Sequence, residues 1–124
     1  MMESLRILVV EDETITAAYI CDELIQLGVN PLKPVISGSD AFHAAIKQKP
    51  DCILMDIQLA GDMDGVETMM KIHERIKIPV VFMSGYSTEL IVEKTRSVDF
   101  MALLEKPVTT PQLESIIRQL KTSV

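Results

Sequence analysis

The segment "CILMDIQLAG", residues 52–61, decides the fold. Its first four residues form an uninterrupted apolar run, which has the length of a strand and offers no polar face to solvent. A strand that is apolar on both sides is typical of a parallel sheet covered by helices on both faces. The run stops at one carboxylate, Asp56, and then resumes. The segment therefore predicts a buried strand that carries an acid at its carboxyl end.

Other apolar segments repeat this pattern and alternate with stretches of helical periodicity. Strands are predicted at residues 5–10, 52–56, 78–84 and 101–105, with a weaker one at 33–37. In the weaker segment, Pro34 suggests that the strand starts late or lies at an edge. Helices are predicted between and after the strands. The first ends before Gly28, the second covers 40–49 with Ser39 or Asp40 as its cap, and the others cover 65–76, 89–96 and 109–120. Thr110 is the predicted cap of the last helix. Strands that alternate with helices in this way predict an α/β fold, a doubly wound five-stranded parallel sheet between two helix layers.

Length and composition indicate one globular unit. The chain has 124 residues, of which 48% are hydrophobic, so residues 1–124 are expected to form a single domain with one core. Cys21 and Cys52 stand alone in apolar segments without a CxxC pattern, as small core residues of a cytoplasmic protein do. Residues 1–10 contain no basic leader and no apolar stretch of membrane-spanning length, so neither export nor a membrane anchor is expected.

The charge balance argues against nucleic acid as a direct partner. The chain carries 18 acidic and 12 basic residues, which gives a formal net charge of −6 at pH 7. No cluster of lysines and arginines interrupts this acidic balance, so a phosphate backbone is repelled on average. We therefore expect proteins, rather than nucleic acid, as partners.

Polar side chains follow four of the five predicted strands. Glu11 and Asp12 follow the first strand, Asp56 ends the third, Ser84 ends the fourth and Lys106 follows the fifth. In open α/β sheets this carboxyl edge is where ligands bind. Three carboxylates with no thiol or imidazole beside them suit a hard cation, and Mg²⁺ fits best.

Formal charges suggest what Asp56 does. The three carboxylates contribute about −3, while a divalent ion and Lys106 return about +3. If Asp56 accepts a phosphoryl group, its own charge is lost in the ester and the site changes by only about one unit. Asp56 is therefore expected to be a nucleophile that forms an aspartyl phosphate.

The chain resembles the CheY-like receiver domains of two-component response regulators over residues 5–121. The motifs that carry the resemblance are "VVEDE" at 9–13, "LMDIQLAGDMDG" at 54–65, "VVFMSGY" at 80–86 and "EKP" at 105–107. Four motifs in this order at strand ends are far more specific than any one of them. The resemblance implies a flavodoxin-like fold with sheet order 2-1-3-4-5 in a three-layer sandwich.

The same resemblance implies roles for the acids. Asp56 would be phosphorylated by a sensor histidine kinase or a histidine phosphotransfer protein. Glu11, Asp12, Asp56 and the main-chain carbonyl of Gln58 would hold Mg²⁺, for which Mn²⁺ is a possible substitute.

Roles for the remaining motif residues follow from the resemblance as well. Lys106 would pair with the phosphoryl oxygens, Ser84 would swing inward to hydrogen-bond one of them, and the peptide bond between Lys106 and Pro107 would be cis. The domain would act as a signalling phosphoacceptor rather than an enzyme. Its output surface, helix 4, strand 5 and helix 5, would bind a partner or a second copy of the chain.

Two other readings remain open at this point. A haloacid-dehalogenase-like phosphatase also uses an aspartyl phosphate, but it needs a second acid two residues after the nucleophile, where this chain has Gln58. A receiver that signals without phosphate would keep the fold, and Leu103 favours it, because the family usually has Tyr or Phe at that place to turn inward with the hydroxyl. The intact Asp56, Ser84 and Lys106 argue against it.

Overall fold

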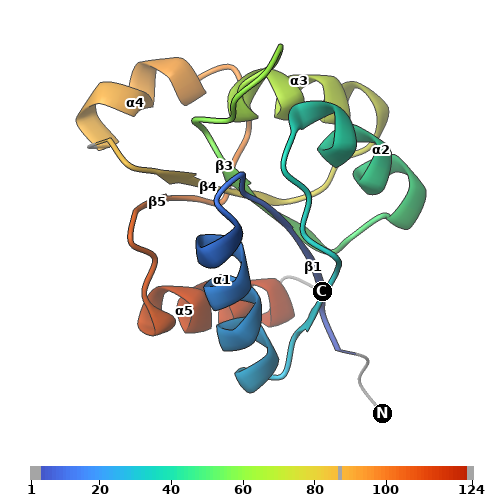
Figure 1. Ribbon diagram of the computed structural model, residues 1–124, viewed down its shortest axis with the longest axis vertical. Coiled ribbons are helices and arrows are strands. Elements are labelled where there is room, and N and C mark those ends of the chain that lie inside the picture. Colours follow the sequence, from blue (N-terminus) through green and yellow to red (C-terminus); the bar gives the residue numbers. More distant parts are fainter. Residues whose placement is uncertain (1–3, 87, 123–124) are drawn as a thin grey trace.

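The computed structural model describes residues 4–86 and 88–122. Both ends of the domain expected at 1–124 therefore lie outside the described residues, as do the first residues of the segment 1–10. Across the described part, five parallel strands form one sheet in the order β2-β1-β3-β4-β5, which confirms the predicted α/β fold and topology (Figure 1). The strands are β1 (Arg6–Val10), β2 (Asn30–Pro31), β3 (Cys52–Asp56), β4 (Val80–Ser84) and β5 (Ala102–Glu105). The helices are α1 (Thr14–Gln26), α2 (Gly38–Gln48), α3 (Gly65–Arg75), α4 (Thr88–Thr95) and α5 (Thr110–Thr122).

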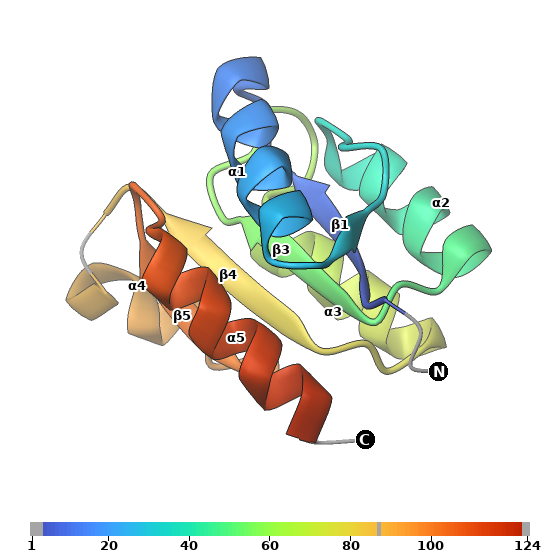
Figure 2. The ribbon, with the colours of Figure 1, turned by 90° about the horizontal axis from the view of Figure 1, so that it is seen from below.

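The two faces of the sheet bury two separate apolar clusters. Because side chains alternate along a strand, successive residues of β1, β3 and β4 point to opposite faces. One face packs against α1 and α5, and the other packs against α2, α3 and α4 (Figure 2). The strands of the sheet centre, β3 and β4, are therefore buried along their whole length. This arrangement is the predicted three-layer sandwich.

The second strand is shorter than predicted and starts earlier. Pairing begins with Asn30 opposite Arg6, and the predicted segment 33–37 contributes only an isolated bridge between Val35 and Val10. Pro34 lacks the N–H that would continue the ladder between these two points. The prediction that this strand lies at an edge is confirmed, and the prediction that it covers 33–37 is wrong.

Two predicted helix caps are shifted. Ser37, not Ser39 or Asp40, caps α2, and its hydroxyl accepts a hydrogen bond from the Asp40 amide at 3.1 Å. At the start of α5, Thr109 and Gln112 exchange hydrogen bonds between amide and side chain, while Thr110 lies inside the helix and donates its hydroxyl to Glu23 on α1. In each case an earlier hydroxyl residue takes the cap, which sequence patterns locate only to within a few residues.

None of the helices in the described part of the chain has the length and apolar character needed to span a bilayer.

Candidate functional site

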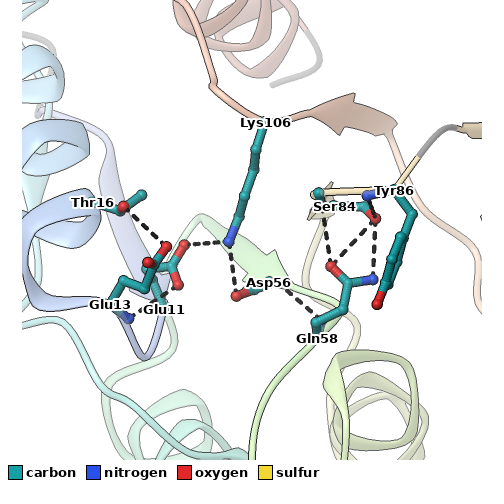
Figure 3. Close-up of polar contacts among 9 residues, drawn as sticks. Glu11, Glu13, Thr16, Asp56, Gln58, Ser84, Tyr86 and Lys106 are labelled. Carbon is teal, nitrogen blue, oxygen red and sulfur yellow. Dashed lines mark hydrogen bonds and ion pairs between the residues drawn. The ribbon is translucent and has the colours of Figure 1, made fainter.

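Four neighbouring strands deliver polar side chains to one edge of the sheet. Asp56 ends β3 in the middle of the sheet, with Glu11 following β1 on one side and Ser84 ending β4 on the other. Lys106 follows β5, and its amide donates a hydrogen bond to the Ser84 carbonyl oxygen at 2.8 Å. Parallel pairing brings these carboxyl ends together, as Figure 3 shows for their side chains.

Three acids form one cluster at this edge. Glu11 is fully buried, Asp56 is 2% exposed, and Asp12 is exposed. One carboxylate oxygen from each lies within 4.8 Å of the others. Such a group of hard oxygen ligands could hold a metal ion.

Lys106 bridges the two buried carboxylates. Its Nζ lies 2.7 Å from Glu11 Oε1 and 2.9 Å from Asp56 Oδ2 (Figure 3). Burial lowers the pKa of this ammonium group, but the hydrogen bonds and charges of Glu11 and Asp56 outweigh burial, so the pKa is raised overall. Lys106 therefore stays charged at neutral pH. The peptide bond that follows it, to Pro107, is cis, as the resemblance implies.

Burial makes Glu11 the electrostatically costly member of the cluster. Loss of hydration raises the pKa of its carboxyl group to about 7, against the lowering effects of Lys106 and of the Glu13 amide. Its Oε1 atom has a charge contact with Lys106 but no hydrogen bond of good geometry within the described residues. A buried carboxylate oxygen with a free lone pair, beside two further carboxylates, fits a hard divalent cation such as Mg²⁺.

Ser84 lies at the same edge of the sheet as Asp56, but its hydroxyl contacts Gln58. The Ser84 hydroxyl contacts the side-chain amide of Gln58, with Oγ 3.1 Å from Nε2 and 3.3 Å from Oε1. Gln58 also donates its backbone N–H to Asp56 Oδ1 at 3.0 Å. Gln58 was expected to contribute only a main-chain carbonyl, so its side-chain role was missed. No local sequence pattern indicates this role, because the contact joins the loop after β3 to the end of β4, 26 residues further along the chain.

Leu103 occupies the position where the family usually has Tyr or Phe. It lies on β5, is half-buried, and packs against the apolar cluster that contains Phe82. The place of an inward-turning aromatic side chain is therefore taken by an aliphatic one that contributes to the core.

A doubly wound α/β fold with three acids, a hydroxyl and a lysine at the carboxyl edge of its sheet defines the class of CheY-like signalling domains. The family model of the response regulator receiver domain matches residues 7–118, and the chain belongs to this family. A receiver domain is a signalling domain rather than a typical enzyme. The match also leaves the phosphatase reading without support.

Known proteins show the same likeness. The chain is 28% identical over 108 residues to the transcriptional regulatory protein PdtaR of Mycobacterium tuberculosis, covering 87% of this chain and 52% of PdtaR. The N-terminal domain of a response regulator/sensory box/GGDEF protein from Carboxydothermus hydrogenoformans superposes with a TM-score of 0.83 and 33% identity, over 95% of each chain. The receiver domain of the sensor histidine kinase PA1611 from Pseudomonas aeruginosa, solved with a magnesium ion coordinated in its active site cleft, superposes with a TM-score of 0.85 and 25% identity, over 95% of this chain and 98% of the other. The chain spans about half the length of PdtaR.

Proposed function

We propose that residues 1–124 form one receiver domain that accepts a phosphoryl group on Asp56 in a Mg²⁺-dependent reaction, with Mn²⁺ as a possible substitute. The observation that carries this proposal is the pairing of Lys106 with both Glu11 and Asp56 at the end of the central strand. This arrangement places an ammonium group against a nearly buried carboxylate, beside the acids that would bind the metal.

The chemistry follows from the positions of these groups. One carboxylate oxygen of Asp56 attacks the phosphorus of the donor, a bond forms between that oxygen and phosphorus, and the bond from phosphorus to the imidazole nitrogen of the donor histidine breaks. The imidazole leaves with the electron pair of that bond. Lys106, already 2.9 Å from Asp56 Oδ2, stabilises the charge on the phosphoryl oxygens as transfer proceeds.

Glu11, Asp12, Asp56 and the main-chain carbonyl of Gln58 are the groups we propose to hold the cation. When bound, the ion supplies positive charge that neutralises the phosphoryl oxygens in the transition state. The three carboxylates are already gathered within bonding reach of one ion.

A partner surface lies beside the site. Ile15 is 86% exposed and Tyr19 is 47% exposed on α1, and they border a cavity of about 500 Å³ that is also lined by Lys106, Pro107 and Val108. Exposed apolar side chains gathered next to a reactive group are typical of a protein-binding site. We propose that a histidine kinase or a histidine phosphotransfer protein docks there, in the cytoplasm.

In this proposal the output surface is formed by α4, β5 and α5. Phosphorylation changes the contacts of the Ser84 and Lys106 side chains. Ser84 ends β4 and Lys106 follows β5, and a backbone hydrogen bond joins the two residues. A change at Asp56 then shifts the conformation of this surface, which binds an effector or a second copy of the chain.

The test is incubation with Mg²⁺ and acetyl phosphate, followed by intact mass measurement. We expect the chain to gain the mass of one phosphoryl group, and Asp56→Asn to gain none, because an amide cannot form the acyl phosphate. Asp62→Asn, in the exposed loop that follows, is the matched control and should be labelled like the parent. Absence of labelling in the parent would favour the reading that the domain signals without phosphate, and labelling of Asp56→Asn would place the phosphoryl group elsewhere.

Mg²⁺ should also stabilise the fold. An ion that binds only the folded state and lies among three acids is expected to raise the melting temperature by about 4 °C at several times its dissociation constant. NaCl at the same ionic strength should give a smaller shift, because it only screens the charges. Equal shifts in the two salts, or an undiminished Mg²⁺ shift in Asp12→Asn, would contradict binding at this cluster.

A further inference from the structure

The Ser84 hydroxyl has no hydrogen-bonding capacity left. Ser84 as a residue is 1% exposed, and its hydroxyl oxygen accepts hydrogen bonds from Gln58 Nε2 at 3.1 Å and from the Tyr86 amide at 3.0 Å. Its own proton faces Gln58 Oε1 at 3.3 Å. A hydroxyl offers one donor and two acceptor positions, so all three are in use. Ser84 cannot bind a phosphoryl oxygen until it gives up a bond to Gln58.

The orientation of the Gln58 amide is fixed by its surroundings. The Gly85 backbone amide, which can only donate, lies 3.2 Å from Gln58 Oε1 and therefore identifies that atom as the oxygen. The amide thus contacts Ser84 at the end of β4 (Figure 3). It also contacts the next residue, Gly85.

Gln58 is also joined to the reactive carboxylate. Its backbone N–H donates to Asp56 Oδ1 at 3.0 Å, while Lys106 contacts Oδ2 of the same carboxylate. The backbone of Gln58 is therefore bound to the phosphoacceptor, and its side chain is bound to the hydroxyl that would sense the phosphoryl group. Gln58 therefore links the phosphoacceptor Asp56 to the hydroxyl of Ser84.

We propose that the Gln58 side chain is a latch that holds Ser84 and Gly85 in the unphosphorylated position and must open before Ser84 can contact a phosphoryl oxygen. The inference rests on the proposed function for the role of Ser84. A hydrogen bond from Ser84 to an anionic phosphoryl oxygen is stronger than one to a neutral amide, so the exchange is favourable. The cost of opening the latch is subtracted from that gain, so the latch sets how strongly phosphorylation shifts the loop. Gln58 acts here as a positioning residue.

The test uses Gln58→Met, which keeps the length of the side chain and removes both polar atoms. The matched control is Gln26→Met, at an exposed position on α1. The first readout needs no phosphate: amide hydrogen exchange of Gly85, followed by NMR in the unphosphorylated chain. We expect Gly85 to exchange about tenfold faster in Gln58→Met, because it loses the acceptor that protects it. The Ile57 amide, which donates to the Met83 carbonyl at 2.9 Å, is the internal reference and should not change.

The second readout is the affinity for beryllium trifluoride with Mg²⁺, a stable analogue of the phosphoryl group. Gln58→Met should bind it about fivefold to tenfold more tightly than the parent, because no latch has to be opened. In a Ser84→Ala background the same substitution should have no effect on affinity, because the hydroxyl that the latch holds is missing. A structural role alone would not produce this dependence on Ser84.

The outcomes separate the latch from the function it depends on. Unchanged Gly85 exchange in Gln58→Met would overturn the latch, and so would faster exchange with an unchanged analogue affinity. An affinity gain that persists in the Ser84→Ala background would also overturn it, since Ser84 would not be the group released. If the parent chain fails to bind the analogue, the proposed function fails and the latch has nothing to gate.

Discussion

Lys106→Met is expected to lower the free energy of unfolding of the metal-free protein by about 2 kcal/mol. The substitution keeps most of the side-chain volume but removes the ammonium group that lies 2.7 Å from Glu11 and 2.9 Å from Asp56. Removing one partner of a buried ion pair costs about 3–5 kcal/mol, and the 20% exposure of the Lys106 side chain allows water to reduce that cost. The measurement is urea unfolding in a metal chelator at pH 8, above the pKa of about 7 that Glu11 has in the parent protein.

Lys94→Met is the matched control. Lys94 lies 2.6 Å from Asp64 Oδ2, as close as any ion pair in the described residues, but its side chain is 49% exposed. An exposed pair of this kind contributes less than about 1 kcal/mol. The larger loss should therefore belong to Lys106, and adding Asp56→Asn to Lys106→Met should restore most of it by removing one of the two stranded charges. Equal losses for the two lysines, or no recovery in the double variant, would contradict the electrostatic account of the site.

Gly65→Ala is expected to destabilise the fold by about 3 kcal/mol, although alanine is the better helix former. Gly65 is the first residue of α3, and a Cβ atom there would lie 2.2 Å from the Asp56 carbonyl oxygen and 2.9 Å from Ile57 Cα. These neighbours are backbone atoms of the strand end that carries the phosphoacceptor, so they cannot move aside as a flexible side chain would. Thermal unfolding monitored by circular dichroism measures the loss.

Gly85→Ala provides the comparison for this substitution. Gly85 follows Ser84 at the same edge of the sheet, but a Cβ atom placed on it meets nothing within 4 Å. We expect its stability to stay within about 0.5 kcal/mol of the parent. If the two alanine variants have the same melting temperature, close packing of α3 against the end of β3 is not the reason for glycine at position 65.

The parallel sheet and the gathering of acids at its carboxyl edge were predictable because they depend on features spread along the whole chain, whereas the sheet order was implied by the resemblance to receiver domains. Apolar runs such as 52–55 fix which segments are buried strands, and parallel pairing then determines where their ends lie. Asp56 and Lys106 therefore meet for topological reasons that need no side-chain detail. Asp64 directly precedes the helix predicted at 65–76, and it forms a reciprocal capping box with Glu67 at the start of α3.

Features that depend on contacts between loops were not predictable in the same way. The pairing of β2 with β1 starts at Asn30 because the backbone there happens to meet Leu5, with a hydrogen bond of 2.8 Å between the Asn30 amide and the Leu5 carbonyl. No local pattern encodes that register in a strand of two residues. The side-chain role of Gln58 was missed for a similar reason, since its partner Ser84 lies at the end of another strand. Taken alone, each of the two residues is typical of a turn.

The short second strand has a consequence for how copies of the chain meet. β2 forms one border of the sheet, and its two residues include Pro31, with Pro34 close behind. A short edge strand with few free amide donors offers little backbone for an extended peptide to pair with. Edge strands of this kind protect proteins against aggregation through their sheet edges. Growth of a continuous intermolecular β-structure from this border should therefore be disfavoured when the protein is concentrated.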